Sequence, residues 1–135
     1  MALIVWSPDL EVGVKIIDEQ HYALVGMINR LSEAMSSGKG KLVLGAILGE
    51  LIDYTGKHFA TEERLMREHA YAHSPSHQAE HRELVRRVTE FKQKFDDGGG
   101  SLAISVLNFL CDWLKKHIQE SDKKFGKHLL DCGVR

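Results

Sequence analysis

Apolar residues recur along this chain at steps of three and four, the spacing that places them on one face of an α-helix. Four such stretches are separated by breaks rich in glycine, serine and proline. The strict alternation of apolar and polar residues that is typical of strands is not found in the sequence. The pattern therefore predicts four amphipathic helices, over residues 19–37, 41–68, 75–95 and 101–120.

Short connections between these helices favour antiparallel neighbours. We therefore predict an all-α fold, in which residues 1–135 form a single domain with an up-down-up-down antiparallel four-helix bundle. Residues 1–17 precede it as an N-terminal arm, and Asp18 is the expected N-cap of the first helix. A further helical turn or short helix is compatible with the pattern from Asp122 to Leu130. The apolar residues expected to fold the arm over the bundle are Trp6, Val12, Val14, Ile16 and Ile17.

Histidines and carboxylates continue the apolar stripes of all four helices. The residues are His21, His58, Glu62, His77, His81, His117 and Asp122. Residues four apart share a helix face, so His58 can converge with Glu62. His77 can converge with His81 for the same reason. If the helices alternate in direction, all seven side chains fall at the same end of the bundle.

One pair does not follow this spacing. His117 and Asp122 are five residues apart, which corresponds to about 140° around an ideal α-helix. The two side chains can converge only if the helix loosens or turns near Ser121.

Seven polar groups on inward helix faces require an explanation. A single core-facing histidine is usually a hydrogen-bonded structural residue, but each unpaired buried polar group costs about 1–3 kcal/mol. Seven of them would rival the ~5–15 kcal/mol of a whole domain's stability. Five imidazoles and two carboxylates suit a pair of metal ions, iron or manganese more than structural zinc. If both carboxylates and one solvent oxygen bridge two six-coordinate ions, one position stays open for a small ligand.

Composition excludes several other classes of protein. The formal net charge of −1 gives no overall field that favours nucleic acid or an anionic membrane. The N-terminus lacks a signal-peptide pattern, and no stretch approaches the ~18 apolar residues of a membrane span. Cys111 lies in an apolar run as a small buried hydrophobe, and Cys132 is expected to be a free thiol. We expect a cytoplasmic monomer without a nucleic-acid partner or membrane span.

The spacing of the seven residues resembles the hemerythrin family, in particular its bacterial single-domain members. The resemblance covers nearly the whole chain, and all seven ligand positions of the family are present. The surroundings Asp18-Glu-Gln-His21 and Trp113-Leu-Lys-Lys-His117-Ile are also similar to those of the family. The shared pattern is His21, then His58-Phe59-x-x-Glu62, then His77-x-x-x-His81, then His117-Ile118-x-x-x-Asp122.

The resemblance implies reversible binding of dioxygen at a non-haem di-iron centre with an oxo or hydroxo bridge, for oxygen transport, storage or supply. It implies a binding protein rather than an enzyme, with at most weak peroxidase or oxidase side activity, and an oxygen-consuming enzyme as a compatible partner. The implied ligands are His77, His81 and His117 for a coordinatively full iron, His21 and His58 for the iron with the open position, and Glu62 and Asp122 as bridges.

Apolar residues within one helical turn of these ligands are candidates for the lining of an oxygen pocket, and each is otherwise an ordinary core residue. The candidates are Leu24, Val25, Tyr54, Phe59, Trp113, Leu114 and Ile118. Three histidines fall outside the ligand pattern and are expected on the surface, namely His69, His73 and His128.

Other functions share part of this pattern. An oxygen or redox sensing module, a di-iron oxidase or peroxidase, and an iron-buffering protein are the alternatives. Carboxylate-rich di-iron proteins use a Glu-x-x-His motif on two helices, and this motif does not occur in the sequence. Turnover with a reductant would indicate an enzyme, and iron beyond two per chain would indicate buffering. A chain without metal would indicate a bundle with fortuitous histidines.

Overall fold

The computed structural model describes residues 4–98 and 102–135, and within these ranges the regular secondary structure is entirely helical. A short 3₁₀ helix, Pro8–Leu10, precedes the main helices, and a π-helical segment, His117–Asp122, connects the last two. The α-helices are α1 (Lys15–Ser36), α2 (Gly40–Glu68), α3 (Ser74–Asp96), α4 (Ala103–Lys116) and α5 (Lys123–Asp131).

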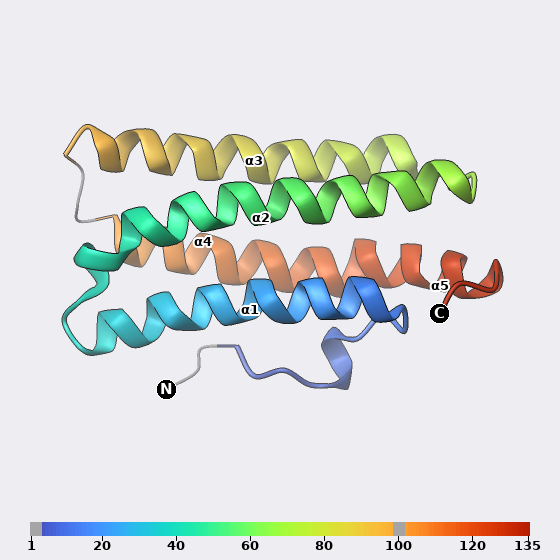
Figure 1. The fold of residues 1–135 in the computed structure, drawn as a ribbon, viewed down its shortest axis with the longest axis horizontal. Coiled ribbons are helices and arrows are strands. Elements are labelled where there is room, and N and C mark those ends of the chain that lie inside the picture. Colours follow the sequence, from blue (N-terminus) through green and yellow to red (C-terminus); the bar gives the residue numbers. More distant parts are fainter. Residues whose placement is uncertain (1–3, 99–101) are drawn as a thin grey trace.

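Helices α1 to α4 lie side by side, and each runs antiparallel to the one before it (Figure 1). Helix α1 packs on α2 and α4, and α2 packs on α3. Aliphatic side chains from every helix fill the interior, and their removal from water drives the packing. Examples with 0–2% exposure are Ile28, Leu48, Val88 and Val106. The predicted all-α antiparallel four-helix bundle is confirmed.

The N-terminal end of α1 differs from the prediction. The helix begins at Lys15 rather than near residue 19, so Asp18 lies in its first turn and is not the N-cap. From there the Asp18 carboxylate accepts hydrogen bonds from the backbone N–H groups of Val12 (2.8 Å) and Gly13 (3.1 Å). Gly13 has a φ of +92°, which favours glycine. The carboxylate satisfies donors that precede the helix, and this allows the helix to start earlier.

The arm before α1 packs along the bundle. The backbone N–H and C=O of Ile4 both bond the Asn29 side chain, at 2.9 and 2.8 Å. Trp6 lies edge-to-face on Tyr22, with ring centroids 5.5 Å apart. Ile16 and Ile17 belong to α1 rather than to the arm, and only Ile17 is buried. Within residues 4–14 of the arm, the buried residues are Ile4, Leu10, Val12 and Val14.

The later helix ends also differ in detail. Helix α3 begins at Ser74, with Pro75 in its first turn, where a missing N–H costs nothing.

The predicted start of the fourth helix, residue 101, lies outside the described residues, as do residues 1–3 of the arm. The fourth helix is predicted to end at residue 120, whereas in the structure α4 ends at Lys116 and helical structure continues through the π-helical segment into α5. The buried side chains of Phe125 and Leu129 anchor α5, which is the short C-terminal helix suggested by the pattern.

Candidate metal centre

All seven polar residues of the helix stripes come together at one end of the bundle. His21 comes from α1, two residues each come from α2 and α3, and the last two come from the π-helical segment. Each of the seven is at most 3% exposed. Their nitrogen and oxygen atoms form two groups of ligating atoms, and both groups contain Glu62 and Asp122.

The π-helical segment explains how His117 reaches the same point as Asp122. The two residues are its first and last members. A π-helix bonds residue i to residue i+5, so residues five apart lie on one face. His117 Nε2 consequently lies 3.3 Å from Asp122 Oδ1. Such segments are rare and are frequently found at functional sites.

The two oxygens of Glu62 face different histidines. Oε1 of Glu62 lies 3.0 Å from His81 Nε2 and 3.5 Å from His77 Nε2. Oε2 of Glu62 lies 3.5 Å from His58 Nε2 and 3.7 Å from His21 Nε2. One carboxylate therefore separates a group on α3 from a group on α1 and α2.

Asp122 divides the histidines in the same way. Its Oδ1 lies 2.9 Å from His77 Nε2 and faces His117, whereas its Oδ2 lies 3.0 Å from His21 Nε2. The arrangement defines two positions that share both carboxylates. We call them the three-histidine position (His77, His81 and His117) and the two-histidine position (His21 and His58).

The atoms that point into this centre lie close to one another but do not form hydrogen bonds. Among the described residues, the five Nε2 atoms and the four carboxylate oxygens are fully buried and make no hydrogen bond of acceptable geometry. Buried polar atoms in proteins are almost always satisfied. Imidazole nitrogens and carboxylate oxygens are ligands for first-row transition metals. The residues therefore fit a metal centre.

In three of the histidines the ring nitrogen that faces away from the centre, Nδ1, is hydrogen-bonded to an acceptor on a neighbouring helix. In each case Nδ1–H donates, which fixes the tautomer and directs Nε2 to the centre. The sequence pattern did not identify these acceptors, although each is adjacent to a ligand or one turn from it. The donor–acceptor distances are 2.6 Å for His58 to Gln20, 3.0 Å for His81 to Glu63 and 2.9 Å for His117 to Glu80.

Glu80 connects the centre to a polar surface cleft. Its carboxylate accepts a hydrogen bond from His117 and further ones from the Ser121 hydroxyl, at 2.7 and 2.8 Å. These hydrogen bonds outweigh partial burial and lower the pKa of Glu80 to about 2. The cleft is also lined by Tyr71, His77 and Lys124. Glu80 is thus an anionic partner for His117 at neutral pH.

Burial and charge act in opposite directions on the buried groups. Burial lowers the pKa of His58 to about 4, because it disfavours the charged imidazolium. At His77 burial acts in the same direction, but Asp122 and Glu62 outweigh it and raise the pKa to about 9. Burial and Asp122 would raise the pKa of Glu62, yet the histidines, His58 first among them, lower it to about 2. Glu62 is therefore ionised at neutral pH and available as a ligand.

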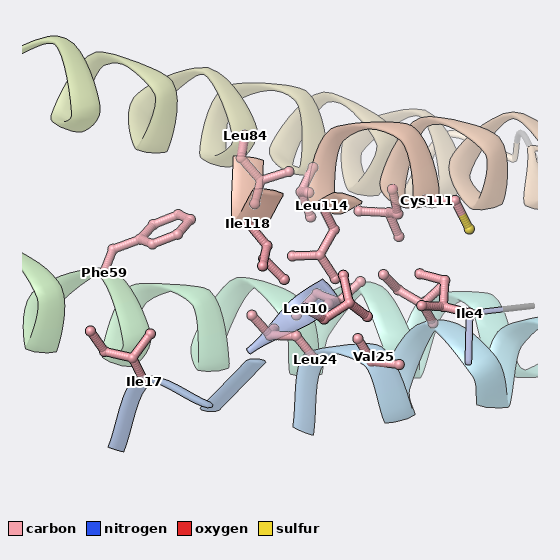
Figure 2. Packing of buried hydrophobic residues seen from close by; sticks show 14 of the residues in the cluster. Ile4, Leu10, Ile17, Leu24, Val25, Phe59, Leu84, Cys111, Leu114 and Ile118 are labelled. Carbon is pink, nitrogen blue, oxygen red and sulfur yellow. The ribbon is translucent and has the colours of Figure 1, made fainter. Parts of the chain in front are cut away.

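The candidate pocket residues fall into two classes. Five of them are buried, at 0–6% exposure, and Figure 2 labels them among the side chains of the apolar interior. Leu24 and Leu114 line a narrow apolar cavity together with Trp113. Tyr54 instead lines an open surface groove with Asp53. The five buried residues are Leu24, Val25, Phe59, Leu114 and Ile118.

Two aromatic rings stack on the three-histidine position. The Phe59 ring lies parallel to His81, with centroids 3.8 Å apart and an interplanar angle of 7°. Trp113 stacks on His117 at 4.4 Å and 17°. The rings cover the faces of these imidazoles and limit their rotation.

The remaining histidines and both cysteines lie outside the centre. His73 is exposed, and the half-buried His128 donates from Nε2 to the backbone carbonyl of His69 at 2.7 Å. Cys111 is a buried free thiol and Cys132 is an exposed one. Across residues 4–98 and 102–135, no helix is long and apolar enough to cross a membrane.

Residues 12–129 match the family model described as "Hemerythrin HHE cation binding domain". The chain belongs to the hemerythrin family. This hemerythrin-family chain is 35% identical to a bacteriohemerythrin of Stenotrophomonas maltophilia over 126 residues, which are 93% of this chain and 81% of the relative. It is 38% identical to a bacteriohemerythrin of Pseudomonas aeruginosa over 122 residues, covering 90% of this chain and 78% of the relative.

A solved crystal structure of wild-type hemerythrin is also similar to this hemerythrin-family chain. The TM-score is 0.86 at 33% sequence identity, and the match covers 95% of this chain and 98% of the solved one. The family membership and the four-helix architecture that the residue spacing indicated are both confirmed.

Proposed function

We propose that this hemerythrin-family chain binds dioxygen reversibly at a non-haem di-iron centre and serves in oxygen transport, storage or supply. One observation carries the proposal. Glu62 and Asp122 each direct one oxygen to the three-histidine position and the other to the two-histidine position. Carboxylates shared between two groups of imidazoles are suited to a pair of iron ions.

The ligand atoms are unequal between the two positions. The three-histidine position offers three Nε2 atoms and two carboxylate oxygens, and the two-histidine position offers two Nε2 atoms and two oxygens. If two six-coordinate ions share one solvent oxygen, the first is full and the second keeps one place. We infer that dioxygen reaches the ion held by His21 and His58. When bound, the iron pair supplies the electron density for reversible oxygen binding.

The protein's own contribution is a dry and rigid surrounding. Leu24, Leu114 and Ile118 are buried within one helical turn of a ligand, and the apolar cavity that Leu24 and Leu114 line is narrow. Exclusion of water limits proton leakage and the hydrolysis of reactive species. The hydrogen-bonded histidines hold their Nε2 atoms in fixed directions. These features favour binding and release, and we expect at most weak peroxidase or oxidase turnover.

The test is iron content together with the visible spectrum of the reduced protein, exposed to dioxygen and then degassed. We expect two irons per chain and a charge-transfer band that grows with oxygen and fades on its removal. Irreversible oxidation would contradict reversible binding and favour an oxidase or redox function. Iron well beyond two per chain would favour iron buffering.

Two variants connect this result to the centre. His77→Ala should lower the iron content below two per chain and abolish the reversible band. His73→Ala, which removes an exposed histidine four residues earlier in the chain, should leave both unchanged. If His77→Ala kept two irons and normal oxygen binding, the ligand assignment would be wrong.

A further inference from the structure

Two of the three histidines in the three-histidine position have anionic outer hydrogen-bond partners. His81 Nδ1 donates to the carboxylate of Glu63, and His117 Nδ1 donates to the carboxylate of Glu80. A carboxylate acceptor draws the Nδ1 proton toward itself and makes the imidazole a more basic ligand at Nε2. Such charge-assisted hydrogen bonds are stronger than neutral ones.

The outer partners of the two-histidine position carry no charge. His58 Nδ1 donates to Gln20 Oε1 at 2.6 Å, and Gln20 is only 7% exposed. His21 Nδ1 is buried and makes no hydrogen bond within the described part of the chain. The two positions therefore share the same bridging carboxylates but differ in how strongly their imidazoles are polarised.

A hydrogen-bond chain fixes the orientation of the Gln20 amide. The Thr61 hydroxyl donates to the Lys57 backbone carbonyl at 3.1 Å, so only its lone pairs face Gln20. Gln20 Nε2 donates to this hydroxyl at 3.3 Å. The amide oxygen is thereby directed to His58, which can donate only from Nδ1 and keeps Nε2 free for the centre.

We propose that Gln20, oriented by Thr61, is a positioning residue that keeps the two-histidine position the weaker of the two metal sites. This inference rests on the di-iron centre proposed above. A neutral acceptor holds the His58 ring in place without adding to the donor strength of its Nε2. The ion that retains an open coordination place is consequently the one held less tightly, whereas Glu63 and Glu80 strengthen the other position.

The experiment follows the loss of ferrous iron from the anaerobic, fully loaded protein to excess ferrozine. For the unaltered chain we expect two phases of equal amplitude, one iron each. Gln20→Glu replaces the neutral acceptor with a carboxylate of similar shape. It should slow the fast phase by about tenfold, the lower end of the usual effect of such partners on metal affinity, and leave the slow phase unchanged.

Glu63→Gln is the reciprocal variant. It gives His81 the neutral partner that His58 has in the unaltered chain, and it should accelerate the slow phase without changing the fast one. A general effect of charge near the centre would move both phases together, so opposite effects on separate phases identify the partner of each histidine. Glu63→Gln also keeps the test available if Gln20→Glu does not fold.

A matched pair at Thr61 tests the orientation of the amide. Thr61→Ser retains a hydroxyl that can accept from Gln20, and it should leave both phases unchanged. Thr61→Val has nearly the same shape but no acceptor, which frees the amide to turn its N–H groups toward His58. We expect the fast phase to accelerate several-fold in the valine variant alone.

The outcomes separate the two proposals. Fewer than two irons per chain in the unaltered protein would contradict the di-iron centre itself. Two irons whose fast phase is unchanged in Gln20→Glu, or a response confined to the slow phase, would overturn the role of Gln20 and leave the di-iron centre intact.

Discussion

At one end of the bundle aliphatic side chains fill the interior, and at the other end imidazoles and carboxylates lie among the apolar side chains. Leu31, Leu44 and Val106, all 0% exposed, lie in the half that is remote from α5. Glu62 and Asp122, equally buried, lie in the half next to it. Both halves use the same helices and the same inward-facing positions, so the difference is one of side-chain chemistry rather than of fold.

The two halves should therefore depend on different sources of stability. Full burial of a leucine contributes about 1.5–3 kcal/mol, so the apolar half is stable without a ligand. Each unpaired polar group in the other half costs about 1–3 kcal/mol, and a bound metal ion offsets that cost. We expect the apolar half to hold the bundle together and the polar half to make its stability depend on metal.

The largest effect is expected when a ligand shared by both metal positions is removed. Asp122→Ala takes one oxygen from each position, so the variant should lose both irons. It should also lose the metal-dependent stabilisation, which is about 4 kcal/mol when free metal is a thousandfold above its dissociation constant. Iron analysis measures the loss of metal, and urea unfolding with and without iron measures the metal-dependent free energy of unfolding. Asp131→Ala, at an exposed position in α5, is the control and should retain both irons.

A cavity in the apolar half should have a different signature. Leu48→Ala, at a fully buried position in α2, should lower the free energy of unfolding by about 2–5 kcal/mol. Because the change is remote from the centre, the loss should be the same in iron-loaded and iron-free protein, and two irons should remain bound. Loss of iron in this variant would show that the two halves are not independent.

The sequence predicted the polar half well because helix periodicity alone puts His21, Glu62 and His77 on inward faces. For His117 and Asp122, the five-residue spacing predicted that the helix must loosen or turn near Ser121, and the π-helical segment is where it does so. The sequence did not identify the change as a π-helix, because His117-Ile-Gln-Glu-Ser-Asp122 contains no local signal for one extra residue per turn.

The outer partners were missed for a related reason. Gln20, Glu63 and Glu80 are polar residues next to inward-facing ones, and sequence alone does not distinguish them from solvated surface residues. Their role depends on contacts between helices. Asp18 was assigned as an N-cap because its residue type suits that position, but the bonds it accepts from Val12 and Gly13 depend on the path of the arm.

The pH dependence of stability should also distinguish the polar half from the apolar half, because the polar half contains buried histidines with raised pKa values. In iron-free protein the pKa values of His77 and His117 are raised to about 9 and about 10, because nearby carboxylates outweigh burial. The folded state then holds protons that the unfolded state releases. This stabilisation is complete below about pH 6.5 and is lost as pH rises through about 9 and 10.

In the proposed centre iron would take the place of these protons, so the loaded protein should not show the alkaline loss. We expect the difference in melting temperature between loaded and iron-free protein to widen from about pH 7 to about pH 10, as metal binding strengthens with deprotonation of its ligands. A constant difference over this range would contradict the assignment of His77 and His117.

The smallest effect on iron content is expected from substitutions where the apolar half meets the polar half. Leu110 and Leu114 lie on successive turns of α4 and line the same apolar cavity. Leu114 is the nearer of the two to His117 in the sequence. Both Leu114→Ala and Leu110→Ala should keep two irons. Autoxidation, followed by the decay of the oxygenated spectrum, should be faster in Leu114→Ala. Equal rates in the two variants would argue against a pocket role for Leu114.

The most direct test of the account is a crystal structure of the iron-loaded protein with an anomalous difference map at the iron edge. We expect two iron peaks, each in contact with one oxygen of Glu62 and one oxygen of Asp122. Three imidazoles should bind the first and two the second. A single peak, or two peaks that share neither carboxylate, would contradict the shared di-iron centre.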